Sequence, residues 1–218
     1  MHPDWLSNAY LVADETGGSA VFVDAGADPA PLDALVAEWG VTPAVVLRTH
    51  AHQDHVAFED EVRDRYGIEV VASPGEWAWG GIRVRGVATP GHSDDMVAFL
   101  VGGDLVFTGD TLFKDAVGGG DPDQVRASVM DVFMRLPDAM RVLPGHTEET
   151  TIGREREHNP FVRVWSGAEP EGTERVRVGG RDATLLVWSP DYDGKGKAWV
   201  RFADGGEAIV GGSRVERA

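Results

Sequence analysis

The sequence predicts an α/β fold that is followed by a small all-β unit. In residues 1–165, short apolar runs typical of strands alternate with amphipathic stretches typical of helices. This alternation favours a layered α/β arrangement over a helical bundle or a barrel. Near Ser166 the composition becomes rich in Gly, Glu and Pro, as in a linker, and only short strand-like runs follow. We therefore expect two domains, at residues 1–165 and 166–218.

The first domain starts with a hairpin signal. Apolar runs at 7–12 and 20–24 flank the turn-forming residues 15–18. Asp28 and Pro29 predict the start of a helix over about residues 30–39, which Gly40 ends. Further along, the patterns predict strands at 44–48, 68–72, 82–88, 96–101, 104–108 and 141–143, and helices over about 56–66 and 123–136.

The second domain is predicted to be a small SH3-like barrel. Its strand-like runs are bounded by Gly, Asp or Pro turns and lie at 175–178, 183–189, 197–202 and 207–210. We assign Trp188, Tyr192, Trp199 and Phe202 to the core of this barrel, because large aromatic side chains are usually well buried.

The charge and the residue counts exclude several classes of protein. The 218 residues include 36 acidic and 20 basic side chains and no cysteine, with a formal net charge of -16. Without cysteine there are no disulfides, thiolate zinc sites, iron–sulfur clusters or cysteine nucleophiles. The acidic charge disfavours nucleic acid. No stretch approaches the roughly 20 apolar residues of a membrane helix, and no secretion leader opens the chain. We expect a cytoplasmic protein without membrane or nucleic-acid partners.

Histidines are concentrated in one short segment that follows a predicted strand. The sequence THAHQDH at residues 49–55 contains His50, His52, Asp54 and His55. In extended backbone, His50 and His52 point to the same side. The helical turn that follows brings Asp54 and His55 toward a neighbouring position. Imidazole and carboxylate groups suit zinc and related divalent metals, so this segment is predicted to bind metal.

Three further segments each place one His or Asp beyond a predicted strand. They are TPGHSD with His92, FTGDT with Asp110 and LPGHT with His146. Loops at strand ends along one sheet edge are where α/β proteins usually build their sites. Each motif alone also fits an ordinary turn, but together with the histidine segment they indicate one metal centre. Asp24, at the end of another strand, is either an anchor for that segment or a turn residue.

The series THAHQDH, PGH, GDTLF and PGH resembles the metallo-β-lactamase fold superfamily, and in particular its glyoxalase II-like hydrolases. The resemblance covers about residues 7–165. It implies an αββα sandwich, with one metal held by His50, His52 and His92. A second metal would be held by Asp54, His55 and His146. Asp110 would bridge the two metals.

This ligand set predicts a binuclear metal-dependent hydrolase. Two divalent cations about 3.5–4 Å apart can share a water, lower its pKa to about 7 and aim the resulting hydroxide at a carbonyl. Asp110 would set the spacing of the metals, and Asp54 would also orient the nucleophile and accept its proton. Zn²⁺ is the expected metal, with Fe and Mn as alternatives. The resemblance implies a small-molecule substrate, a thioester of a small thiol cofactor.

The sequence departs from glyoxalase II in ways that leave the substrate open. A glyoxalase II has a C-terminal helical domain that binds glutathione, whereas residues 166–218 are strand-like here. One alternative is an oxidoreductase similar to the mononuclear iron persulfide dioxygenases, which use two histidines and an aspartate. Another is a lactone or β-lactam hydrolase on the same site. A homodimer is a further option that the sequence does not decide.

Overall fold

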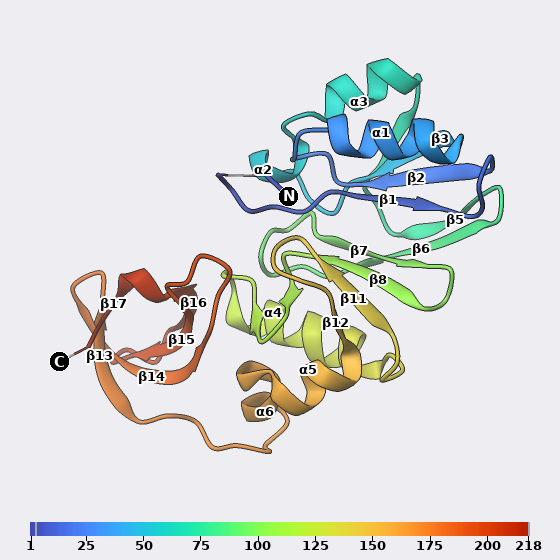
Figure 1. Ribbon diagram of the computed structural model, residues 1–218. Helices are drawn as coiled ribbons and strands as arrows, with labels where there is room; N and C mark the ends of the chain where they lie inside the picture. The colour runs from blue at the N-terminus through green and yellow to red at the C-terminus, as the bar shows by residue number, and fades with distance from the viewer. Residues whose placement is uncertain (3, 218) are drawn as a thin grey trace.

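The computed structural model describes residues 1–2 and 4–217 and shows two facing β-sheets whose outer faces are covered by helices (Figure 1). This is the αββα sandwich that the resemblance implies. A smaller, curled sheet at the C-terminal end lies beside the second helical layer (Figure 1). None of the helices in the described part of the chain has the length and apolar character needed to cross a bilayer.

The first sheet combines the predicted hairpin with two parallel strands. Its strands, in spatial order, are β1 (Tyr10–Ala13), β2 (Ser19–Val23), β3 (Thr42–Leu47) and β4 (Glu69–Val71). β1 is antiparallel to β2, whereas β2, β3 and β4 run parallel. Val21 and Val23 pack in the core between the two sheets. The alternate residues Ala20 and Phe22 pack under the helices. The period of two therefore buries both faces of the sheet.

The helices α1 (Ala30–Trp39) and α3 (Glu59–Tyr66) cover the first sheet (Figure 1). The sequence predicted a single helix over about 56–66, and its start is wrong. The N–H of Phe58 donates to the carbonyl of Ala25 at 2.8 Å, which takes it out of the helical ladder. The chain therefore forms a separate short helix, α2 (Gln53–Val56), ahead of α3.

The second sheet contains the remaining predicted strands and some that were not predicted. Its spatial order is β12 (Thr150–Thr151), β11 (Arg141–Pro144), β8 (Leu105–Gly109), β7 (Val97–Val101), β6 (Ile82–Ala88) and β5 (Gly75–Trp79). β5 and β12 were not predicted. Trp77 and Trp79 on β5 stack with their ring centroids 6.4 Å apart and pack against the core between the sheets. β9 (Leu112–Phe113) and β10 (Ala116–Val117) form a short antiparallel pair after β8.

The outer face of the second sheet is covered by several short helices (Figure 1). They are α4 (Pro122–Ala127), the π-helix η1 (Ser128–Val132), the 3₁₀ helix η2 (Phe133–Arg135), α5 (Ile152–His158) and α6 (Pro160–Trp165). The helix predicted at 123–136 is thus present but changes type twice, and α5 and α6 were not predicted. Asp121 and Asn159 cap α4 and α6 by accepting hydrogen bonds from backbone N–H groups.

The C-terminal unit is a curled antiparallel sheet, which confirms the small all-β appendage. Its spatial order is β16 (Glu207–Gly211), β15 (Lys197–Phe202), β14 (Arg181–Ser189), β13 (Glu174–Val178) and β17 (Val215–Arg217), with the 3₁₀ helix η3 (Gly212–Arg214) before β17. Residues 166–173 form turns and irregular structure, as their composition predicts.

The curled sheet shares buried apolar surface with residues that precede 166. Trp199 and Ile209 belong to the same buried cluster as Trp165 at the end of α6. The rings of Trp165 and Trp199 lie 6.0 Å apart. Trp188 is 38% exposed, so its assignment to a barrel core is wrong, whereas Phe202 does pack against the unit's own core.

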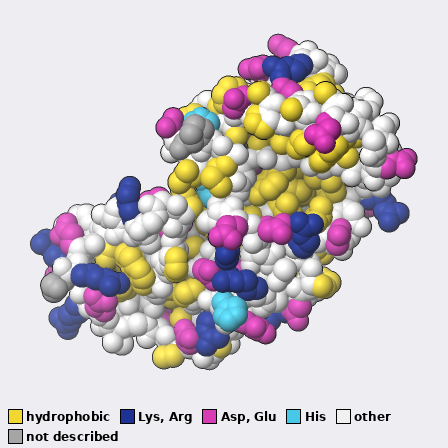
Figure 2. Space-filling view, viewed as in Figure 1, with side chains coloured by type: hydrophobic (Ala, Val, Ile, Leu, Met, Phe, Trp, Pro, Cys, Tyr) yellow, Lys and Arg dark blue, Asp and Glu magenta, His cyan; other side chains and the backbone are white. Residues whose placement is uncertain are grey.

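Apolar side chains also gather where the edge strand β1 faces β8 and β11 (Figure 2). The groove at this margin is lined mainly by Tyr10, Val12, Trp39, Phe107 and Leu143. Here the core between the two sheets reaches the surface.

Candidate metal centre

The predicted ligands follow strands that end at one edge of the sandwich. His50 and His52 follow β3, His92 follows β6, Asp110 follows β8 and His146 follows β11. β6, β8 and β11 run in the same direction within the second sheet, so their carboxyl ends lie at the same edge. The short helix α2, which starts within the histidine segment, carries the remaining predicted ligands, Asp54 and His55.

His50, His52 and His92 form the first group of ligand atoms. Nδ1 of His52 lies 3.0 Å from Nε2 of His50 and 2.9 Å from Nε2 of His92. The three nitrogen atoms all lie within 4.8 Å of one another. His50 is buried, His92 is partly buried and His52 is exposed, so the group opens to solvent at His52.

Asp54, His55 and His146 form the second group. Oδ2 of Asp54 lies 3.3 Å from Nε2 of His146 and 3.6 Å from Nε2 of His55. Both imidazoles are buried, whereas the Asp54 side chain is 24% exposed. This carboxylate therefore forms the open side of the second group.

Asp110 lies between the two groups. Its Oδ2 is 3.6 Å from Nε2 of His92 and 3.3 Å from Nε2 of His146, and its Oδ1 is 3.3 Å from Nε2 of His55. Burial opposes ionisation of Asp110, but contacts with His146 and His55 hold its pKa well below the ordinary value. A buried carboxylate that faces both groups occupies the position that a bridging ligand requires.

The spacing and chemistry of these atoms fit divalent metal ions. Ligand atoms of a tetrahedral zinc ion, each about 2.0–2.1 Å from the metal, lie about 3.4 Å apart. The distance of 3.3 Å between Nε2 of His55 and Oδ1 of Asp110 matches this value. Both atoms are buried, and neither has a hydrogen-bond partner within residues 1–2 and 4–217. Since buried polar atoms normally have partners, a cation between them would satisfy both.

The rings of His92 and His146 are oriented by backbone carbonyls. Nδ1 of His92 donates to the carbonyl of Gly119 at 2.9 Å, and Nδ1 of His146 donates to the carbonyl of Leu6 at 3.1 Å. These contacts select the tautomer in which Nε2 has a free lone pair. Nε2 of each ring is thereby available to a metal.

Asp24 anchors the histidine segment and also has the left-handed backbone of a turn residue, with a φ of 55°, so both alternatives for this residue hold. Its Oδ2 accepts hydrogen bonds from Nδ1 of His55 and Oγ1 of Thr49, both at 2.8 Å. Its Oδ1 accepts from the backbone N–H of Thr49 at 2.7 Å. Oγ1 of Thr49 in turn lies 3.1 Å from Nδ1 of His50. One buried carboxylate therefore orients a histidine in each ligand group.

Local electrostatics divide the histidines of the metal-free site into two classes. Burial lowers the pKa of His50 to about 4. Burial also opposes protonation of His55 and His146, but adjacent carboxylates, led by Asp24 and Asp110, raise their pKa values to about 11 and about 9. At pH 7, His50 is therefore ready to bind a metal, whereas His55 and His146 must first release protons.

The structure also brings Tyr192 to the site, which sequence reasoning missed. Tyr192 lies in the turn between β14 and β15 and stacks on the ring of His146, with centroids 4.0 Å apart and planes 8° apart. Its assignment to the barrel core is wrong. The surrounding sequence, PDYDGKG, has the composition of an ordinary turn and contains no signal for this contact.

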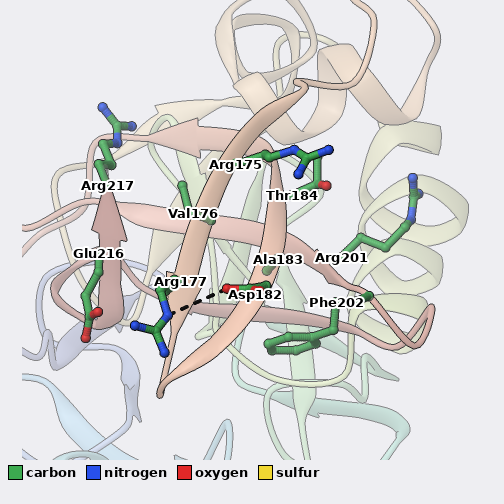
Figure 3. A pocket seen from close by; sticks show the side chains of 11 residues that line it. Arg175, Val176, Arg177, Asp182, Ala183, Thr184, Arg201, Phe202, Glu216 and Arg217 are labelled. Atoms are coloured by element: carbon green, nitrogen blue, oxygen red, sulfur yellow. Dashed lines mark ion pairs between the residues drawn. The ribbon is translucent and has the colours of Figure 1, made fainter.

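A second hollow lies on the C-terminal sheet (Figure 3). Its lining residues include four arginines, Arg175, Arg177, Arg201 and Arg217. None of the predicted metal ligands is among the lining residues in the described part of the chain. Most of these arginines have acidic neighbours, as in the ion pair between Arg177 and Asp182 in Figure 3. The hollow is therefore separate from the candidate metal centre, and its charge is largely balanced.

An αββα sandwich with His and Asp side chains converging at one edge defines a class of metal-dependent enzymes. The chain belongs to the metallo-beta-lactamase superfamily, whose family model matches residues 2–88. The chain is 31% identical over 201 residues to a probable metallo-hydrolase, YqgX, of Bacillus subtilis (strain 168), and the match covers 73% of this chain and 94% of the relative. It is 35% identical over 156 residues to a hydroxyacylglutathione hydrolase of Anaeromyxobacter dehalogenans (strain 2CP-C), covering 63% of this chain and 60% of that protein.

Solved structures support the same family. The crystal structure of the B3 metallo-beta-lactamase BLEG-1 is similar with a TM-score of 0.69 and 28% identity, covering 74% of this chain and 96% of that chain. The crystal structure of TTHA1623 in a di-iron-bound form is similar with a TM-score of 0.62 and 33% identity, covering 74% of this chain and 97% of that chain.

Proposed function

We propose that this protein is a binuclear metal-dependent hydrolase that cleaves thioesters of a small thiol. The observation that carries the proposal is the position of the Asp110 carboxylate, whose oxygens lie 3.3–3.6 Å from nitrogens of both ligand groups. A carboxylate shared by two ligand groups can hold two cations close together, as two-metal hydrolases require.

The side chains of the site would have two roles, metal binding and proton transfer. When bound, two divalent cations supply the Lewis acidity that polarises an acyl carbonyl and lowers the pKa of a water. His50, His52 and His92 would hold one ion, and Asp54, His55 and His146 the other, with Asp110 between them. Contact with His146 lowers the pKa of Asp54 although burial opposes this, so Asp54 is ionised. On the open side of the site, its carboxylate would orient the incoming water and accept its proton.

Zn²⁺ is the metal that we propose first, with Fe and Mn as alternatives. Imidazole nitrogens and carboxylate oxygens suit zinc and also suit non-haem iron. Iron is supported by the similarity to the di-iron form of TTHA1623.

The thioester class is supported by the similarity to hydroxyacylglutathione hydrolase. That match covers only 60% of the relative, and residues 174–217 of this chain form a curled sheet. We therefore propose the thioester class without assigning a thiol. The net charge of -16 also favours a small-molecule substrate over a nucleic acid.

Metal analysis combined with a substrate panel tests the proposal. The purified, metal-replete protein is expected to contain two metal ions per chain and to hydrolyse acyl thioesters faster than lactones or β-lactams. One iron per chain together with persulfide-dependent oxygen uptake would show that the protein is the alternative oxidoreductase and not a hydrolase. Hydrolysis of lactones or β-lactams alone would keep the metal centre but replace the substrate class. The similarity to the BLEG-1 β-lactamase is the observation that places β-lactams in the panel.

A further inference from the structure

The turn between β14 and β15 reaches from the C-terminal sheet to the candidate metal centre. Tyr192 in this turn lies parallel to the imidazole of His146, with ring centroids 4.0 Å apart. The ring of Phe113 lies nearly perpendicular to both rings, at centroid distances of 5.7 Å from His146 and 5.9 Å from Tyr192. The His146 ring is therefore confined by two aromatic rings.

These aromatic contacts restrict the tilt of the His146 ring, which its hydrogen bond does not fix. The bond from Nδ1 to the carbonyl of Leu6, 3.1 Å long, fixes one ring atom but allows the ring to tilt about it. Stacking of Tyr192 resists that tilt. It thereby keeps Nε2 of His146 3.3 Å from oxygens of both Asp54 and Asp110.

Tyr192 is itself held by a buried ion pair. Oδ1 of Asp191 accepts a hydrogen bond from the backbone N–H of Tyr192 at 3.0 Å. Oδ2 of Asp191 lies 2.9 Å from Nζ of Lys197, and the two side chains are only 3% and 9% exposed. Nζ of Lys197 also lies 5.8 Å from the centre of the Tyr192 ring. Burying an ion pair is costly unless its geometry is good, so a buried pair adds little to overall stability. We assign this pair a local role, which is to hold the turn that contains Tyr192.

The curled sheet also contacts the loop that orients the other ligand group. The N–H of Gly120 donates to the carbonyl of Ile209 on β16 at 3.3 Å. The preceding residue, Gly119, provides the carbonyl that binds Nδ1 of His92. The C-terminal unit therefore contacts the surroundings of one histidine in each ligand group.

We propose that the C-terminal unit is an integral part of the metal centre, with Tyr192 as a positioning residue for His146. The inference rests on the proposed binuclear site and assigns the unit a role in holding the second metal. Removing the hydrogen-bonding partners that orient metal ligands changes metal affinity by about 10–100-fold, and we expect an effect of the same order for the stacking ring.

Metal-binding measurements on variants of Tyr192 test this inference. The full-length protein is stripped of metal, and Zn²⁺ affinities are determined by competition with a chromophoric chelator. Tyr192→Ala and Tyr192→Leu are expected to lower the Zn²⁺ affinity of the second ligand group, which contains His146, by about 10–100-fold. The Zn²⁺ affinity of the first ligand group is expected to stay unchanged. Tyr192→Phe, which keeps the stacking ring, is expected to restore the wild-type affinity. The absorption spectrum of the Co²⁺-loaded variants provides an independent report on the geometry at the second site.

Phe202→Leu is the matched control, because Phe202 is an aromatic residue of the same unit that packs against the unit's own core and contacts Arg181 instead of the site. It is expected to bind both ions as the wild type does. Folded Leu and Ala variants of Tyr192 with unchanged affinities and Co²⁺ spectra would overturn the inference. So would a Phe variant as weak as the Leu variant, because stacking would then not be the cause. A wild-type chain that binds no second metal would instead contradict the proposed function itself.

Discussion

Gly145 and Asp110 approach so closely that a Cβ atom on residue 145 would lie 2.2 Å from Oδ1 of Asp110. The same atom would lie 2.7 Å from Cε1 of His55. The N–H of Gly145 donates to the carbonyl of Gly109 at 2.8 Å, which joins the loops after β8 and β11. A glycine directly before His146 is therefore required if Asp110 is to face both ligand groups.

We expect Gly145→Ala to destabilise the protein by about 1–3 kcal/mol, as overpacking of buried sites does. It is also expected to lower the metal content, because the methyl group displaces Asp110 or His55. Urea unfolding of the metal-free protein and elemental analysis measure the two effects. Gly211→Ala is the control, because its Cβ would meet only Oγ of Ser213, at 3.9 Å. Equal stability and metal content in both variants would contradict the packing argument.

Asp110→Ala is expected to reduce kcat for the best thioester by at least ~100-fold, and by more than His52→Ala does. Asp110 faces both ligand groups, so its removal loosens both metals and their spacing, whereas His52 belongs to one group. Steady-state kinetics and metal analysis of the two variants test this ranking. Near-normal turnover of Asp110→Ala with full metal content would show that Asp110 does not bridge.

Asp24→Asn is expected to weaken metal binding by about 10–100-fold while the chain stays folded. An amide oxygen in the place of Oδ2 can still accept the hydrogen bonds from Nδ1 of His55 and Oγ1 of Thr49. The NH₂ group then faces the backbone N–H of Thr49, which now donates to Oδ1 of Asp24 at 2.7 Å, so two donors meet. Chelator competition measures the loss. Asp28→Asn is the control, because Asp28 accepts only a local hydrogen bond from the N–H of Ala30. Similar affinities for both variants would limit Asp24 to a structural role.

In the metal-free protein, we expect the free energy of unfolding to fall as the pH rises from 7 to about 9.5. The folded pKa values of His146 and His55, about 9 and about 11, lie above their ordinary value of 6.5. Their protonation therefore contributes stability that is fully present below pH 6.5 and is lost as the pH rises through the folded values. Bound metal replaces these protons, so the metal-loaded protein should lack this fall. Urea unfolding at several pH values, with and without Zn²⁺, tests the sign, and a rise in stability for the metal-free protein would contradict it.

Local sequence patterns predicted many of the elements, and long-range contacts explain several of the misses. The alternating apolar residues of β2 and the Gly40 stop of α1 depend on neighbours along the chain, and both agree with the structure. The start of α3 was wrong because Phe58 bonds to Ala25, far earlier in the sequence. β5 was missed because its apolar pattern is short and lies between Gly75 and Gly80, and pairing with β6 makes it a strand.

The sequence by itself determined the superfamily and predicted the set of ligand side chains, because short spacings and glycine turns place each of these His and Asp residues after a strand. Only the tertiary structure decided how these side chains meet. The Asp110 position between the groups depends on packing of the loops after β8 and β11, and the anchoring of His55 depends on Asp24 at the end of β2. The stacking of Tyr192 on His146 joins residues 46 positions apart across two folding units. Such a contact arises from the docking of buried apolar surfaces, and no local pattern in the chain encodes it.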